Sequence, residues 1–135
     1  MTIESFIAQF GEKFSHDFTI SPEVYSSFQS QTKDMNPLHV DEEYAKGRGF
    51  QNRVMYGNIL NGFISYFVGM CLPCPEVMLL KQDIIYLQAL YLNDTVTFTA
   101  TIEKTYPKFN MVDFKYNFMR QDTLVARGHI QIKLL

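Results

Sequence analysis

Strict alternation of side-chain type in the C-terminal third constrains the fold of this chain more than any other feature. From Thr95 to Ile102, hydroxyl and apolar side chains alternate residue by residue. Because successive side chains in a β-strand point to opposite faces of a sheet, this pattern predicts a strand with one buried face. The alternation recurs over residues 112–118 and 124–134. We therefore expect an antiparallel meander of three strands.

Turn-forming residues separate these segments and bound two others. Tyr106-Pro107-Lys108 and Arg120-Gln121-Asp122 are expected to form the turns of the meander, and Asn93-Asp94 the turn before it. Residues 77–87 predict a further strand, and residues 13–20 predict a strand near the N-terminus.

A long apolar helix is the second constraint. It is expected to begin at Gly57, after a loop over residues 48–56, and to end near Met70. Its side chains are apolar on nearly every side, so most of its circumference should be buried. One such helix followed by antiparallel strands indicates an α+β fold in which a sheet wraps around the helix.

Two shorter helices are expected upstream. Ser21-Pro22-Glu23 combines an N-cap, a first-turn proline and an acid, and so predicts a helix that ends near Gln31. Pro37 disfavours a helical conformation in the residue before it, so residues 33–40 are expected to form an extended or turning loop. A second short helix is expected over residues 41–46, where a following glycine ends it.

Composition and charge bound the class of protein. With 135 residues and 47% hydrophobic content the chain can build one core, so we expect a single domain over residues 1–135. The net charge of −2, without a run of Lys or Arg, argues against nucleic acid as a partner. The first residues do not resemble a secretory signal, and the apolar stretch 59–72 is short and interrupted. We therefore expect a cytoplasmic protein that does not cross a membrane.

The two cysteines, Cys71 and Cys74, form a C-x-x-C spacing. They could be a redox pair or half of a zinc site, but no second Cys or His pair lies nearby and no thioredoxin-like pattern surrounds them. We interpret them as small apolar residues at the end of the long helix, and we expect no metal.

A stripe of polar residues runs along the otherwise apolar helix. Asn58, Asn61 and Ser65 stand at positions i, i+3 and i+7, which share one helix face. Two interpretations are open. These side chains could satisfy backbone groups at a subunit interface, or they could line a ligand tunnel.

A carboxylate and an imidazole lie on either side of an Asn-Pro turn. Asp34 and His39 are five residues apart; Pro37 argues against a helix that joins them, whereas a turn can bring both side chains to one point. Asp and His around one water molecule can add or remove water near neutral pH. The alternative is structural, because an Asp before Asn-Pro is often a turn residue.

The sequence around this pair resembles the signature of MaoC-like dehydratases and (R)-specific enoyl-CoA hydratases. The stretch T-K-D-M-N-P-L-H-V-D-E-E-Y-A-K is similar to the family pattern G-D-x-N-P-x-H-x-D-x-x-[YF]-A. Two later stretches, R-V-M-Y-G-N-I-L and Y-L-Q-A-L-Y-L-N-D-T-V, resemble further family motifs. The resemblance covers roughly residues 18–102. It implies a hotdog fold, in which a sheet wraps a long central helix and two subunits form a continuous sheet.

Carried over residue by residue, the resemblance implies a catalytic pair and an anion site. Asp34 and His39 match the family's catalytic residues, and Gly57 matches the glycine whose N–H contributes to its oxyanion hole. The start of a helix presents unpaired N–H groups and the positive end of the helix dipole, which independently favours an anion there. The family's helix serine matches Ser65. We expect three side chains to contact the substrate as well: Asn36, Asn58 and Ser65.

The activity that the resemblance implies is the reversible syn hydration of a trans-2-enoyl thioester to the (R)-3-hydroxyacyl thioester. The thioester would be carried by CoA or by acyl-carrier protein, the protein would be a homodimer, and no metal or redox cofactor would be required. Two other functions stay open. One is a hotdog thioesterase, although residues 58–70 lack the acid that such enzymes commonly carry on the helix. The other is a non-catalytic protein that binds acyl thioesters.

The chain departs from the family pattern at four positions. Lys33 stands in place of a Gly before the Asp, Tyr56 in place of a His before the Gly, and Ala89 and Asn93 replace a Pro and a Gly. Lys33 could pair with Asp34 and lower its basicity, and Tyr56 changes the wall of the pocket, so an altered substrate range is expected.

Overall fold

The computed structural model describes all 135 residues, and its centre is a six-stranded antiparallel sheet. The strands run in the spatial order β1-β4-β5-β6-β2, with β3 also paired to β6. The predicted meander is confirmed as β4-β5-β6. The strands have these bounds: β1 Phe14–Thr19, β2 Val77–Gln82, β3 Ile85–Tyr86, β4 Thr95–Tyr106, β5 Met111–Arg120 and β6 Thr123–Leu134.

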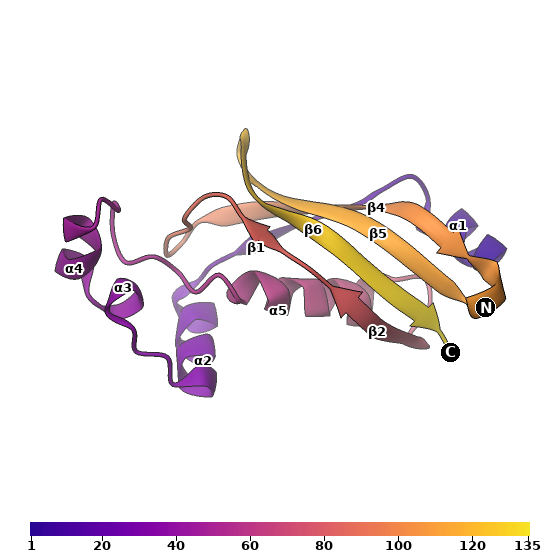
Figure 1. Cartoon of the computed structure of the whole chain (residues 1–135), viewed down its shortest axis with the longest axis horizontal. Coiled ribbons are helices and arrows are strands. Elements are labelled where there is room, and N and C mark those ends of the chain that lie inside the picture. The colour runs from indigo at the N-terminus through magenta and orange to yellow at the C-terminus, as the bar shows by residue number, and fades with distance from the viewer.

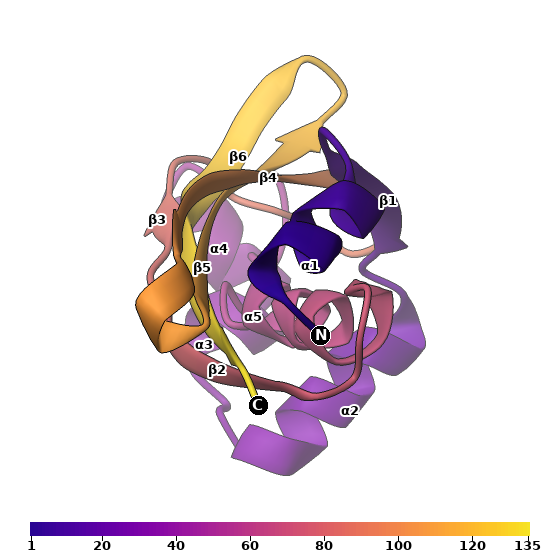
Figure 2. The same ribbon diagram turned by 90° about the vertical axis from the view of Figure 1, so that its right-hand side faces the viewer.

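The sheet arches over the central helix α5 (Figure 2), and α2, α3 and α4 gather near the N-terminal end of α5 (Figure 1). None of the helices has the length and apolar character that a membrane span requires. The helices have these bounds: α1 Ile3–Phe10, α2 Pro22–Thr32, α3 Pro37–Val40, α4 Glu42–Gly47 and α5 Ile59–Tyr66, which continues as the π-helical turn η1 Phe67–Cys71, and the short 3₁₀ turn η2 Pro107–Phe109.

The core lies between α5 and the inner face of the sheet. Strand β4 buries alternate residues, as its sequence pattern predicts, and each large apolar side chain removed from water contributes about 1.5–3 kcal/mol. Helix α5 and η1 contribute the facing apolar surface. A sheet wrapped around one central helix is the α+β hotdog arrangement expected from the sequence. The helix is buried on fewer sides than expected, because residues 62, 65, 66, 69 and 70 are exposed. The fully buried large side chains are Phe6, Ile20, Leu60, Ile64, Phe67, Val96, Phe98, Phe114, Tyr116, Phe118, Ile130 and Ile132.

Helix α1 is an element that the sequence analysis did not assign. The side chain of Thr2 caps it by accepting a hydrogen bond from the N–H of Ser5 at 3.1 Å. Phe6 and Phe10 lie on one face, and the Phe10 ring packs against Phe114 with 5.2 Å between ring centroids. The helical spacing of these aromatic residues is the signal that could have revealed α1.

The strand expected over residues 77–87 is interrupted at Asp83, whose backbone hydrogen bonds stabilise the interruption. The Asp83 carbonyl accepts a hydrogen bond from the Tyr116 hydroxyl at 2.6 Å, and the Asp83 N–H donates to the carbonyl of His129 at 3.1 Å. A Cβ at Gly128 would lie only 2.1 Å from the Asp83 carbonyl oxygen, so this approach requires glycine. The break divides β2 from β3 and thereby fixes where Tyr86 lies.

The prediction of an extended or turning loop over residues 33–40 is wrong for its second half, because Pro37 begins the short helix α3. Proline restricts the residue before it, and that residue, Asn36, lies outside the helix. The Asn36 side chain caps α3 by accepting a hydrogen bond from the N–H of Leu38 at 3.0 Å. His39 therefore lies on a helical turn.

Candidate active site

Asp34 and His39 approach each other across the start of α3. The distance from Asp34 Oδ2 to His39 Nε2 is 3.9 Å. The other carboxylate oxygen of Asp34 accepts a hydrogen bond from the N–H of Asn36 at 3.0 Å, which fixes the side chain in its turn. A separation of 3.9 Å is too long for a direct hydrogen bond, but one water about 2.8 Å from each atom would bridge them.

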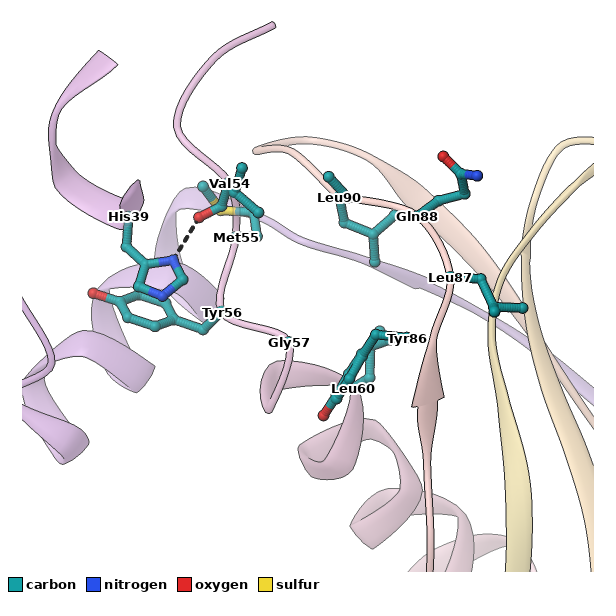
Figure 3. Close-up of a pocket in the computed structure, with 11 residues that line it drawn as sticks. His39, Val54, Met55, Tyr56, Gly57, Leu60, Tyr86, Leu87, Gln88 and Leu90 are labelled. Atoms are coloured by element: carbon teal, nitrogen blue, oxygen red, sulfur yellow. Dashed lines mark hydrogen bonds between the residues drawn. The ribbon is translucent and has the colours of Figure 1, made fainter. Parts of the chain in front are cut away.

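The carbonyl of Val54 sets the tautomer of His39. It lies 2.7 Å from His39 Nδ1 (Figure 3), and a carbonyl oxygen can only accept, so Nδ1 carries a hydrogen. In the neutral ring Nε2 is then an acceptor, and Nε2 is the atom that faces Asp34. Both groups thus offer a lone pair to the two hydrogens of a shared water.

His39 borders a mostly apolar cavity of about 350 Å³. The cavity lies between the chain entering α5 and the chain leaving β3 (Figure 3). Asp34 does not line it, but its carboxylate faces His39, which does. The lining residues are His39, Val54, Met55, Tyr56, Gly57, Leu60, Tyr86, Leu87, Gln88, Ala89 and Leu90.

Gly57 lines the same cavity and offers an unused hydrogen-bond donor. No group of the chain accepts a hydrogen bond from its N–H. The first backbone bonds of the turn that opens α5 are donated by Ile59 and Leu60, to the carbonyls of Tyr56 and Gly57, both at 3.1 Å. The free N–H therefore stands at the positive end of α5, which favours an anion or a developing negative charge.

The polar stripe on α5 forms a side-chain network with the edge of the sheet. Asn61 Nδ2 donates to Asn58 Oδ1 at 2.8 Å, and the Tyr86 hydroxyl donates to the same oxygen at 3.2 Å. Gln82 of β2 donates to Asn61 Oδ1. Burial raises the pKa of Tyr86, so its hydroxyl stays protonated. Ser65 is exposed and is not part of this network.

Of the four predicted substrate contacts, the structure brings only Gly57 to the cavity wall. Asn36 caps α3, and Asn58 is hydrogen-bonded to Tyr86 and Asn61.

Lys33 forms no ion pair with Asp34, contrary to one expectation; it ends α2 in a left-handed conformation with φ of 56°. No Lys or Arg side chain forms an ion pair with the Asp34 carboxylate.

Sequence reasoning missed the residues that hydrogen-bond to the segment carrying the pair. Val54 acts through its carbonyl, which no sequence pattern reveals. Tyr25, on α2, donates a hydrogen bond to the carbonyl of His39 at 2.7 Å, and Gln29, one helical turn further on, donates to the Tyr25 hydroxyl at 3.3 Å. Nothing in the sequence indicates that this face of α2 lies against the segment with His39. Cys71 and Cys74 are free thiols, and burial raises the pKa of Cys71. No cluster of three or more His, Cys, Asp or Glu side chains has an arrangement suited to a metal ion.

Comparison with known proteins gives consistent matches over most of the chain. A family model described as MaoC like domain matches residues 6–121. The (R)-specific enoyl-CoA hydratase of Rhodospirillum rubrum is 33% identical over 122 residues, which are 90% of this chain and 85% of that protein. The 3-hydroxybutyryl-CoA dehydratase of Methylorubrum extorquens is 24% identical over 115 residues, covering 85% of this chain and 73% of that protein.

Solved structures agree on the fold. The (R)-hydratase from A. caviae superposes with a TM-score of 0.84 at 21% sequence identity, covering 93% of this chain and 96% of that one. The common architecture therefore extends over nearly the whole of both chains.

Proposed function

Because the chain belongs to the MaoC-like domain family, we propose that it hydrates trans-2-enoyl thioesters to (R)-3-hydroxyacyl thioesters, reversibly. Addition or removal of water at a CoA thioester is the activity for which both relatives are named, and this chain is accordingly a hydro-lyase. The observation that carries the proposal is the 3.9 Å separation of Asp34 Oδ2 and His39 Nε2 beside an apolar cavity.

In this mechanism one water molecule donates a hydrogen bond to each member of the pair. One of the two lone pairs on its oxygen points outward, to the β-carbon of the enoyl group. Asp34 acts as the base and removes a proton as the water oxygen bonds to the β-carbon. His39 holds and polarises the same water, in the tautomer that the Val54 carbonyl selects.

The electrons of the C=C bond move to the thioester oxygen, which becomes an enolate oxygen. The free N–H of Gly57 stabilises this charge, an effect worth roughly 3–4 kcal/mol per donor in other enzymes. As the enolate collapses, the proton held by Asp34 is transferred to the α-carbon. Water is thereby added across the double bond on one face, and the enzyme returns to its initial state.

A second copy of the chain is proposed to cover the β2–β3 edge of the sheet. Leu79, Leu80 and Ile85 are 43–50% exposed there, and an unpaired, apolar edge favours pairing with another strand. A homodimer with a continuous sheet would bury these side chains.

Three further points stay predictions: the carrier of the thioester, CoA or acyl-carrier protein; the single-domain organisation; and the cytoplasmic location.

The test is to follow crotonyl-CoA hydration and thioester hydrolysis side by side. The proposal expects loss of the enoyl absorbance and formation of (R)-3-hydroxybutyryl-CoA, without release of free thiol. Release of CoA thiol as the main reaction would identify a thioesterase instead. Binding without either reaction would identify a non-catalytic acyl-thioester-binding protein.

A further inference from the structure

A cluster of two tyrosines and one glutamine joins α2 to the backbone of both members of the Asp34–His39 pair. The Tyr25 hydroxyl donates to the carbonyl of His39 at 2.7 Å, and the Tyr56 hydroxyl donates to the carbonyl of Asp34. Between the two rings, Gln29 Nε2 donates to both hydroxyls, each at 3.3 Å.

The direction of every hydrogen bond in this cluster follows from the chemistry of its members. Backbone carbonyls can only accept, so both hydroxyls must donate to them. Each hydroxyl then has only lone pairs left to offer Gln29, and the amide must present its NH₂ group rather than its oxygen. That group has two hydrogens for two acceptors. The cluster is therefore fully paired in one arrangement, and reversal of the amide would break both bonds to the tyrosines.

The tyrosines of the cluster are buried, whereas the pair that it contacts lies on short segments of the chain. Tyr25 and Tyr56 are 8% and 3% exposed, and the Tyr56 ring packs on Phe28 at 5.0 Å and on the His39 ring at 4.2 Å between centroids. Burial raises the pKa of Tyr56, which keeps its hydroxyl a donor. Asp34 lies in a turn and His39 on the four-residue helix α3, and such short segments have little stability of their own.

We propose that Gln29, through Tyr25 and Tyr56, fixes the separation of Asp34 and His39 so that the pair holds one water molecule. This inference rests on the proposed function. Gln29 and Tyr25 do not line the cavity and are positioning residues that act through the two backbone carbonyls. One amide thereby couples the placement of the base to the placement of the imidazole.

The test compares Gln29→Leu and Tyr25→Phe with matched controls. Gln31→Leu alters an exposed residue of the same helix whose side chain forms no hydrogen bond, and Tyr106→Phe removes a hydroxyl that donates to Asp113 elsewhere on the sheet. For crotonyl-CoA hydration we expect kcat to fall about tenfold to a hundredfold in Gln29→Leu and Tyr25→Phe, as for a small misplacement of catalytic groups. The dissociation constant of the unreactive butyryl-CoA should stay within about twofold, because catalysis rather than binding depends on this placement. Both controls should match the wild type.

Coupling between the two variants gives a second readout. Because both act through one network, the double variant Tyr25→Phe/Gln29→Leu should lose less activity than the product of the single losses. Unchanged kcat in both single variants of an active protein, or equal losses of kcat and affinity, would overturn the proposal. Multiplicative losses would do the same.

An NMR measurement separates failure of this inference from failure of the proposed function. In protein labelled with ¹⁵N-histidine, the Nδ1–H signal of His39, identified by its absence from His39→Ala, should be sharp in the wild type and in both controls. It should be broadened in Gln29→Leu and Tyr25→Phe, because the ring then samples several positions against the Val54 carbonyl. An unbroadened signal would contradict the positioning role even in a protein without hydratase activity. An inactive wild type with a broadened variant signal would contradict only the proposed function.

Discussion

The ring of Tyr86 lies against Gly57 so closely that a methyl group on residue 57 would come within 2.9 Å of Tyr86 Cε1. A shift of the ring would disturb the hydrogen bonds of its hydroxyl with Asn58 and Asn61, at 3.2 and 3.3 Å. The Tyr86 ring therefore borders the free N–H that is proposed to receive the enolate oxygen.

Gly57→Ala keeps the backbone N–H but adds a methyl group that crowds the oxyanion site, so kcat for crotonyl-CoA hydration is expected to fall, by at most about the hundredfold that loss of one oxyanion donor costs in other enzymes. The added methyl group must displace either the Tyr86 ring or the start of α5. Gly62→Ala is the matched control, since a methyl group there meets nothing within 4 Å. Replacing Tyr86 by Leu in the Gly57→Ala background should restore part of the lost activity. Near wild-type turnover in Gly57→Ala alone would show that the contact between residue 57 and the Tyr86 ring does not position the N–H for catalysis.

Gly128→Ala is expected to destabilise the fold by at least about 3 kcal/mol, because its methyl group would overlap the Asp83 carbonyl and force the backbone apart. Urea denaturation measures the loss. Gly47→Ala, where the added group meets nothing, should change the free energy of unfolding by less than about 1 kcal/mol. Equal stability of the two variants would show that the break between β2 and β3 is not held as described.

The sequence alone predicted local features of the sheet and of the site, and it missed the features that depend on contacts between distant residues. Alternation over residues 95–102 predicted a buried face because the side-chain period of a strand is a local property. The break at Asp83 could not be foreseen, since it depends on Gly128, which is far away in the sequence and adjacent only in the folded sheet. The pairing of Asp34 with His39 was predicted, whereas the short helix that carries His39 was not.

Two departures from the family pattern have a local explanation. Lys33 and Asn93, which stand where the pattern has glycine, adopt φ values of 56° and 68°. Glycine is favoured there because left-handed backbone costs a side chain about 1–2 kcal/mol. The glycines of the family pattern at these two positions thus reflect a left-handed backbone conformation. The sequence alone suggested instead that Lys33 pairs with Asp34, and this ion pair is not formed.

Stability at alkaline pH should depend on Tyr116. Burial, then the nearby charge of Asp83, raises the pKa of its phenol above 10, the value at which the unfolded chain ionises. Above pH 10 the unfolded state releases a proton that the folded state keeps, so stability present below pH 10 is lost as the pH rises, by up to about 1.4 kcal/mol per pH unit. Between pH 9 and pH 11 the free energy of unfolding should fall less in Tyr116→Phe than in the wild type. Parallel pH profiles would contradict this assignment.

A negative charge introduced at the β2–β3 edge should dissociate the proposed dimer into monomers. Ile85→Glu places a carboxylate on the exposed apolar edge, where burial by a second copy would cost several kcal/mol. Sedimentation equilibrium at micromolar concentration should show a dimer for the wild type and a monomer for the variant. Phe109→Glu, at an exposed apolar residue of the η2 turn, is the control and should remain dimeric. A monomeric wild type would refute the dimer.

The most direct test of the central claim is the turnover of crotonyl-CoA by Asp34→Asn beside the wild type. The account predicts that the wild type forms (R)-3-hydroxybutyryl-CoA and that Asp34→Asn, which keeps its shape but loses its basic oxygen, is slower by about 10²–10⁴-fold. Its melting temperature and its affinity for butyryl-CoA should be unchanged. Asp41→Asn, at an N-cap where Asn serves equally well, should keep full activity. Near wild-type hydration by Asp34→Asn would contradict the claim that Asp34 and His39 share the reacting water.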